Sequence, residues 1–354
     1  MAERESGDDR GRNSGGSGSG GSGPSGPGGS GPGADDPIGH DATDDRVIGG
    51  SGHDKVDLST ESVHGHNFSA NGMQTVDRHG GRTTLYSNVG ELRFLDGRVV
   101  LDEGDPAAQV VRLYRAALGR EADQGGLNAW TARLQGGGRL SDLAESFLKA
   151  PEFQARYGVL DDTGFVDRLY QNVLGRAGDA TGRAYWVDRL HQGTSRADVL
   201  ASFAESAENK AATRGVVAAG IWDRSENAQQ VARLYDTVFG RLPDASGLSY
   251  WRARLDDGSA KAQDVANAFT GSGEFAQRYG ALSNRDFVEA LYRNTLGRAG
   301  DATGTEFWTS RLDAGQSSRA GVTLAFSDSA EHQARTAPLF AADDPAHYGI
   351  ALSG

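Results

Sequence analysis

The chain contains no cysteine among its 354 residues, and this absence removes several kinds of chemistry at once. Disulfide bonds, thiolate metal sites and cysteine nucleophiles are all excluded. The sequence also lacks an apolar run of about 18 residues, so we expect no membrane span. The first residues have no apolar stretch of the kind found in a secretory signal peptide. We therefore expect either a cytoplasmic protein or export by a route that reads no N-terminal signal.

Enzyme motifs are missing as well. The sequence has no G-x-S-x-G, no H-E-x-x-H, no P-loop, and no G-x-G-x-x-G placed between a strand and a helix. We therefore expect no enzymatic activity. The formal net charge of -12 argues against nucleic acid or an anionic membrane as the main partner.

The N-terminal third divides into two regions by composition. Residues 11–33 are almost entirely Gly, Ser and Pro, which cannot bury enough apolar surface to offset the entropy of ordering. We predict a disordered tail over residues 1–37 and a small β-rich cap over residues 38–104. Within the cap, Asp96-Gly97 stands between two β-forming runs, which is a strong hairpin signal.

The cap contains one candidate metal site. The segment Asp44–Leu58 matches G-G-x-G-x-D-x-U-x, the nonapeptide of calcium-binding parallel β-rolls, in one good copy. The glycines allow tight turns, and an aspartate supplies a hard oxygen ligand for Ca²⁺. The possible calcium ligands are Gly50, Gly52, Asp54 and Asp45. The alternative is a Gly/Asp-rich turn between short strands that binds no metal.

The rest of the chain is dominated by one motif present in four copies. The copies are LYRAALGREADQGGLNAW from Leu113, LYQNVLGRAGDATGRAYW from Leu169, LYDTVFGRLPDASGLSYW from Leu234 and LYRNTLGRAGDATGTEFW from Leu291. A motif that recurs in this way along one chain is typical of a tandem array, in which each copy is one supersecondary unit.

Apolar residues in each copy recur with a helical period, and a glycine follows where a left-handed C-cap is expected. We predict three helices per repeat, beginning with Asp105 as N-cap and Pro106 at the first helical position. Copies one and three share the ending EF..RYG, so pairs of repeats are the predicted unit. The expected fold is mainly α, with four three-helix repeats in two lobes: residues 105–216 hold repeats 1 and 2, residues 217–340 hold repeats 3 and 4, and residues 341–354 form a C-terminal tail.

Three motif positions are candidates for either structure or ligand binding. The aspartate precedes a helix and is expected to cap it, the arginine to pair with an acid, and the tryptophan to pack in the core. An alternative is a sugar or anion site built from the same side chains. The residues are Arg120, Asp123 and Trp130; Arg176, Asp179 and Trp186; Arg241, Asp244 and Trp251; and Arg298, Asp301 and Trp308.

The four copies, over Gln109–Thr336, resemble a small helical repeat of unknown function that is common in large bacterial secreted proteins. That repeat is similar to the linker domains of phycobilisomes. The stretch Leu85–Asp102, together with the nonapeptide, resembles the segment that precedes such repeats in RTX-type proteins. Those are often exported by type I secretion, so the resemblance implies an extracellular or cell-surface protein and implies no activity.

We therefore expect a non-enzymatic, secreted or surface-associated bacterial interaction or adhesion module with a protein or surface polysaccharide as its partner. Ca²⁺ is the one cofactor that the sequence suggests. The alternatives are an extracellular glycan-binding module and, with a cytoplasmic location, an intracellular assembly linker.

Overall fold

The computed structural model describes residues 37–39, 46–48, 54–63, 66–69, 73–77, 83–340 and 349–353. The predicted tail at residues 1–37 lies outside these residues except for Pro37. Of the predicted calcium ligands, Asp54 is described, and Asp45, Gly50 and Gly52 lie outside the described residues.

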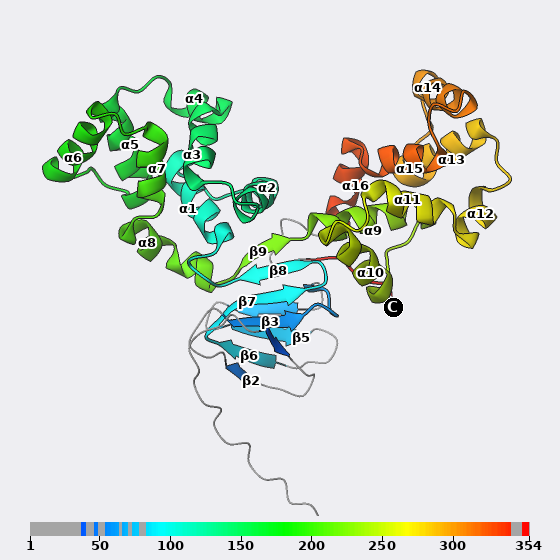
Figure 1. The fold of residues 1–354 in the computed structure, drawn as a ribbon, viewed down its shortest axis with the longest axis horizontal. Helices are drawn as coiled ribbons and strands as arrows, with labels where there is room; N and C mark the ends of the chain where they lie inside the picture. Colours follow the sequence, from blue (N-terminus) through cyan, green and yellow to red (C-terminus); the bar gives the residue numbers. More distant parts are fainter. Residues whose placement is uncertain are drawn as a thin grey trace, which may run out of the picture. The chain divides into compact units, whose positions relative to one another are not determined.

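The strands of the cap form two sheets (Figure 1). Their bounds are β1 Pro37–Gly39, β2 Arg46–Ile48, β3 Asp54–Leu58, β4 His66–Ser69, β5 Met73–Asp77, β6 Thr83–Ser87, β7 Val89–Phe94, β8 Gly97–Val100 and β9 Ile221–Arg224. One sheet has the order β1-β3-β7-β8-β9 and the other β2-β6-β5-β4. Strands β1, β3 and β7 pair in parallel, and so do β2 and β6. The chain therefore moves from one sheet to the other and back between β1 and β3, as a coiling chain does.

The hairpin predicted at Asp96-Gly97 is confirmed, because β7 and β8 pair antiparallel with Phe94 opposite Gly97. The turn itself is Leu95-Asp96, and Gly97 begins the second strand. Gly97 is needed for a close approach and not for a positive φ. A Cβ at this position would lie 2.4 Å from the indole of Trp222 on the neighbouring strand.

The last strand of this sheet was not foreseen. Strand β9 lies between repeats 2 and 3 in the sequence and pairs antiparallel with β8, Val100 opposite Ile221 and Gly97 opposite Arg224. Its four residues follow Gly220, whose φ of 92° turns the chain out of the preceding helix. The sheet is therefore completed by a segment from within the predicted helical array.

The mainly helical fold class is confirmed. The helices of repeat 1 are α1 Pro106–Leu118, α2 Gln124–Gln135, α3 Leu140–Lys149 and α4 Pro151–Tyr157; those of repeat 2 are α5 Asp162–Leu174, α6 Ala180–His191, α7 Arg196–Ala204 and α8 Ala207–Ala218. Repeat 3 contains α9 Glu226–Phe239, α10 Ala245–Asp256, α11 Ala262–Thr270 and α12 Gly273–Tyr279; repeat 4 contains α13 Asn284–Leu296, α14 Ala302–Asp313, α15 Arg319–Ser327 and α16 Ala330–Phe340.

Each repeat thus has four helices where the sequence pattern predicts three. The predicted third helix is divided in two at the residue that precedes the fourth helix. In repeat 1 this residue is Ala150, which precedes Pro151 and has φ −62° and ψ 139°. In the other repeats a serine caps the new helix with its hydroxyl: Ser206, Ser272 and Ser329.

The helix ends follow the sequence signals closely. The Asp105 carboxylate accepts from the amide of Ala107, and Pro106 is the first helical residue, as predicted. The first helix of every repeat ends at a glycine in the left-handed region, with φ of 61°, 65°, 59° and 68° at Gly119, Gly175, Gly240 and Gly297.

The helical part has two apolar cores, which we use to define two repeat pairs. The first core runs from Val100 to Ile221 and includes Leu113, Leu169 and the side chains around them. The second runs mainly from Ala228 to Ile350 and includes Leu234 and Leu291. A third core lies in the cap and contains Trp222 of β9. Residues 33–354 form one compact unit, so the division at residues 216 and 217 stays a prediction.

The segment at residues 349–353 returns to the cap. The buried carboxylate of Asp96 accepts from the amides of Val63 and Ile350, at 3.0 and 2.6 Å, and from the Ser62 hydroxyl. Ser353 donates its amide to the carbonyl of Pro243 at 3.0 Å. The Ile350 bond connects this segment to the β7-β8 turn, and the Ser353 bond connects it to the loop between α9 and α10.

Candidate functional site

The four motif aspartates cap the second helix of their repeats, as predicted. Each accepts a hydrogen bond at 2.8 or 2.9 Å from the amide of the motif glycine three residues later: Gly126, Gly182, Gly247 and Gly304. This bond holds the pKa of Asp123 below its usual range. The glycine is required because a Cβ there would lie within 1.9 to 2.3 Å of the tyrosine hydroxyl of the first helix.

The four motif arginines pair with the glutamate in the first turn of the fourth helix. Arg120 and Arg298 reach both carboxylate oxygens of Glu152 and Glu331 at 2.6 and 2.8 Å. The equivalent pairs are Arg176 with Glu208 at 3.0 Å and Arg241 with Glu274 at 3.2 Å. One guanidinium in each repeat thus joins the end of the first helix to the start of the fourth.

The motif tryptophans are half-buried and pack against a phenylalanine of the third helix. The ring centroids are 5.5, 5.1, 5.8 and 6.0 Å apart in the pairs Trp130–Phe147, Trp186–Phe203, Trp251–Phe269 and Trp308–Phe326. Arginine, aspartate and tryptophan therefore repeat one arrangement that holds the helices of each repeat together.

The structure exposes a different set of rings that the sequence pattern did not single out. The residue before the tryptophan is Tyr185, Tyr250 and Phe307 in repeats 2, 3 and 4, and these side chains are 53%, 54% and 51% exposed. Each ring lies edge-on to its tryptophan, with centroids 4.9 to 5.1 Å apart. In repeat 1 the same position is Ala129. We call the three rings with their tryptophans the aromatic pairs.

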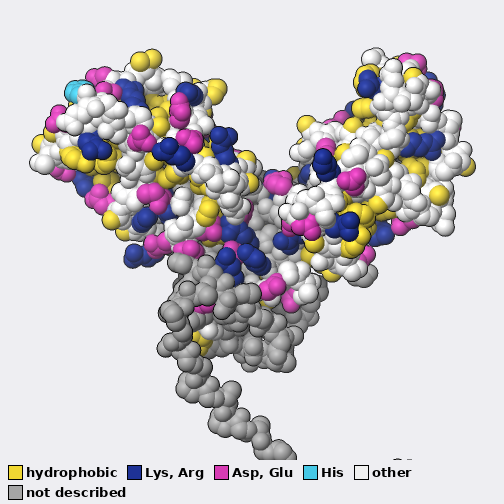
Figure 2. Space-filling view, viewed as in Figure 1, with side chains coloured by type: hydrophobic (Ala, Val, Ile, Leu, Met, Phe, Trp, Pro, Cys, Tyr) yellow, Lys and Arg dark blue, Asp and Glu magenta, His cyan; other side chains and the backbone are white. Residues whose placement is uncertain are grey.

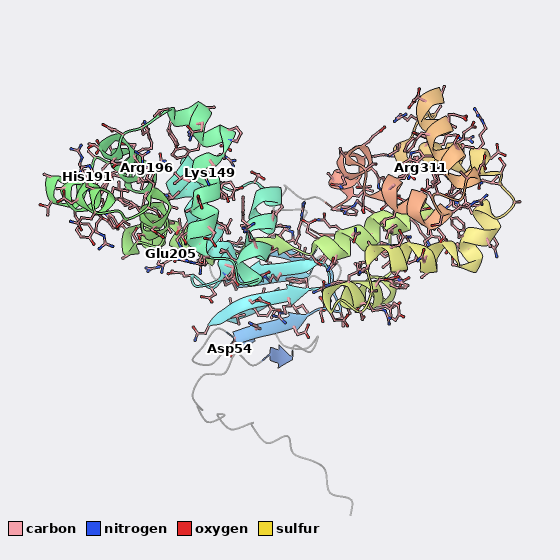
Figure 3. The ribbon with its side chains drawn as sticks, turned by 45° about the horizontal axis from the view of Figure 1, so that its top comes forward. Asp54, Lys149, His191, Arg196, Glu205 and Arg311 are labelled. Carbon is pink, nitrogen blue, oxygen red and sulfur yellow. The ribbon has the colours of Figure 1, made fainter. Side chains whose placement is uncertain are left out.

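In repeats 3 and 4, an arginine one helical turn after the exposed ring lies over that ring. The guanidinium carbon of Arg254 lies 5.4 Å from the centroid of Tyr250, and that of Arg311, on α14 (Figure 3), lies 5.2 Å from Phe307. Each of these two pairs thus presents a planar donor beside an aromatic face. The alternation of Tyr-Trp, Phe-Trp and Ala-Trp among the four copies was the signal that sequence reasoning could have used.

The one described calcium-ligand candidate, Asp54, begins β3, beside residues that the structure does not describe (Figure 3). Its side chain is 8% exposed, and Oδ2 has no hydrogen-bond partner among the described residues. A buried carboxylate oxygen without a donor fits a hard cation such as Ca²⁺. Within the described ranges no group of three or more His, Asp or Glu residues is placed to hold a metal ion.

The chain matches the family model described as a domain of unknown function (DUF4214) over residues 144–213, 222–276 and 266–336. Together these segments cover more than half of the chain, which therefore belongs to this family. The matches at residues 144–213 and 266–336 each begin inside the third helix of one repeat and end in the fourth helix of the next, and the match at residues 222–276 begins in β9 and ends in α12. A search of curated proteins finds no match. Among the described helices none is long and apolar enough to cross a membrane.

Proposed function

We propose that the protein is a non-enzymatic interaction module that binds a surface ligand through its aromatic pairs. The observation that carries this proposal is the exposure of Tyr185, Tyr250 and Phe307 at one position in three repeats. The arginine, aspartate and tryptophan of the motif are engaged inside each repeat, whereas these three rings are half exposed. Exposed aromatic residues that recur at one position are typical of binding surfaces.

A glycan is the ligand class that the aromatic pairs favour. A sugar ring presents C–H groups that stack on an aromatic face, and its hydroxyls accept hydrogen bonds from a planar donor. Arg254 and Arg311 provide such donors beside Tyr250 and Phe307. Three weak sites on one chain also suit a polymer, because a polymer that spans two sites binds more tightly than either site alone.

The test is binding to a panel of immobilised glycans with the triple variant Tyr185→Ser, Tyr250→Ser and Phe307→Ser. We expect a loss of at least tenfold in apparent affinity, because three stacking contacts are removed. The matched control is Ala129→Ser, the same position in repeat 1, which should bind as the unaltered protein does. Equal binding by the triple variant, or no binding of any glycan by the unaltered protein, would contradict the proposal.

We further propose that the protein acts outside the cell or at its surface after type I export. This is supported by the nonapeptide and by the parallel strands that pass between two sheets, as they do in a β-roll. Fractionation of a culture tests it: the protein should be found in the medium or on the surface. Detection in the cytosol alone would contradict it.

Calcium binding in the cap is the remaining part of the proposal. It is supported by the unpartnered Oδ2 of Asp54 and by the nonapeptide around it. A ligand that binds the folded state raises the melting temperature. We expect Ca²⁺ to raise it relative to EDTA in the unaltered protein and not in Asp54→Asn, with Mg²⁺ as the control ion. A melting temperature unaffected by Ca²⁺ would rule the site out.

A further inference from the structure

A cleft of about 430 Å³ lies in the first repeat pair, between α1, α8 and the start of β9. The loop between α1 and α2 and the first turns of α2 also line it. Pockets that bind small molecules are typically about 300 to 1,000 Å³. None of the three exposed aromatic rings lines this cleft, so any ligand of the cleft is independent of the aromatic pairs.

The walls of the cleft are largely apolar. Leu127 of α2 and Ile221 and Trp222 of β9 are buried, and Val111 of α1 is partly buried. Val216 of α8 also lines the cleft, and this side chain is 42% exposed. A ligand that covered Val216 would remove apolar surface from water, which is favourable. The cleft therefore favours a ligand with an apolar body.

Most polar side chains of the cleft already have partners within the protein. The side chains of Gln124, Asn172 and Thr213 each donate to a neighbouring oxygen atom. Arg120 is held by both carboxylate oxygens of Glu152. These groups are occupied in holding the helices together.

Arg115 is different, because no described residue forms a hydrogen bond or ion pair with its side chain. It lines the cleft and is partly buried, one helical turn from Val111 on one side and from Gly119 on the other. Glu121 is the one acidic residue of the lining, and it is exposed and not paired with Arg115. A guanidinium binds a carboxylate through two parallel hydrogen bonds. The unpaired Arg115 therefore favours a ligand that carries a carboxylate.

The second repeat pair uses the equivalent position differently. The counterpart of Arg115 is Asp236, whose carboxylate lies 3.0 Å from Nε2 of the buried His332. In the first pair the counterpart of His332 is Asn209, which donates to two backbone carbonyls and not to Arg115. A position that connects two helices in the second pair is thus left without a partner at the cleft.

The charges of the surface make this single arginine decisive for an anion. Basic and acidic side chains are interspersed over the face shown in Figure 2. The net charge of -12 gives no long-range attraction for anions, so their recognition must come from a local cation. We propose that this cleft binds a small carboxylic acid with an apolar body, whose carboxylate pairs with Arg115 and whose apolar part lies against walls that include Val216.

The experiment is titration calorimetry on the full chain with phenylpropionate, phenylpropanol and acetate. We expect phenylpropionate to bind at least tenfold more tightly than the other two, because it alone has both the charge and the apolar body. Equal binding of phenylpropanol would overturn the role of the carboxylate, and equal binding of acetate would overturn that of the apolar walls. Absence of phenylpropionate binding would overturn the site.

Arg115→Gln should weaken phenylpropionate binding at least tenfold with an unchanged melting temperature, since Arg115 has no partner in the protein. Arg133→Gln is the matched control, because it removes an exposed arginine of the same repeat outside the cleft. Val216→Asp, which places a negative charge on the apolar wall, should weaken binding as strongly. Equal affinity in Arg115→Gln and the control, or in Val216→Asp and the unaltered protein, would contradict the proposal.

The triple variant of the aromatic pairs separates this site from the function proposed above. It should bind phenylpropionate as the unaltered protein does, because the three substituted rings lie outside the cleft. A loss of phenylpropionate binding in that variant would contradict the placement of the ligand at Arg115.

Discussion

The two repeat pairs have the same arrangement of helices, but the buried polar contacts at equivalent positions differ between them. In the first pair Arg112, one residue before Leu113, is fully buried and bonded to both oxygens of Glu205 at 2.7 and 3.0 Å. At the equivalent position in the second pair, Arg233 lies 4.0 Å from the nearest oxygen of Asp328. A shorter acid cannot reach as far, and burial there lowers the pKa of Arg233.

A second position shows the same divergence. Asn209, in the first pair, donates to the carbonyls of Arg112 and Ala204. Its counterpart His332 is equally buried, and its ring nitrogens lie 3.0 Å from the carbonyl of Ser327 and from the Asp236 carboxylate. The repeated motif therefore sets the apolar contacts in both pairs. The buried polar residues outside the motif differ between the pairs, and those that contact one another differ together.

The largest expected effect comes from breaking the tight ion pair. Glu205→Ala leaves the buried Arg112 cation without its partner, which should cost about 3–5 kcal/mol in the free energy of unfolding. Asp328→Ala should cost clearly less, because its contact with Arg233 is already loose. Urea titration followed by far-UV circular dichroism measures both, with Glu208→Ala as an exposed control. Equal losses in the two pairs would contradict the distinction.

The next effect concerns how the two pairs end. Both end in Gly-Ile, with φ of 92° at Gly220 and 94° at Gly349, but Ile221 continues into β9 and Ile350 is held by Asp96. Asp96→Asn places an amide where the Ile350 N–H needs an acceptor. We expect a loss of about 1–3 kcal/mol in the free energy of unfolding.

The same variant tests a pH dependence. Burial raises the pKa of Asp96 above the value of about 4 that is usual for an unfolded chain. The unfolded state therefore ionises first, and stability is lost as the pH rises from about 4 through the raised folded pKa. The stability of the unaltered protein relative to Asp96→Asn should fall over this window and then level off. A constant difference, measured by urea titration at each pH, would contradict it.

The helix caps should show what the repeats have in common. Asp179→Ala and Asp301→Ala each remove one cap bond, so each should lower the free energy of unfolding, and by less than Asp96→Asn does. Because the cap geometry is the same in both pairs, we expect equal losses in chemical denaturation. A twofold difference would show that the pairs differ in more than their centres.

The smallest effect on stability is expected in repeat 1. Ala129→Tyr adds an exposed ring at the position of Tyr185, so the free energy of unfolding should change by no more than about 0.5 kcal/mol. If the aromatic pairs bind a glycan, apparent affinity for that glycan should rise. Unchanged affinity would mean that the ring needs features that repeat 1 lacks.

Local signals predicted the helical part well. The caps, the left-handed glycines and the Asp96-Gly97 hairpin each depend on one or two residues, and all are confirmed. The division of the third helix was missed because helical periodicity continues on both sides of Ala150 and Ser206. Strand β9 was missed because four residues carry little pattern and pair with a strand more than a hundred positions earlier.

The candidate site was predicted only in part. The roles of Asp123 and Trp130 and their equivalents followed from their place before and within a helix. The exposure of Tyr185 did not, because a residue beside a core tryptophan can face either way until the neighbouring helices are placed.

The pairing of Val100 with Ile221 has a consequence for how this chain can be altered. Opposed residues in an antiparallel ladder have Cα atoms about 5 Å apart. Residues 101–220 thus leave the sheet and return to it at neighbouring points, as an inserted domain does. If residues 101–220 were deleted and replaced by a tight turn, β8 would still pair with β9. Addition or removal of a whole repeat pair would then change the length of the array without disturbing the cap.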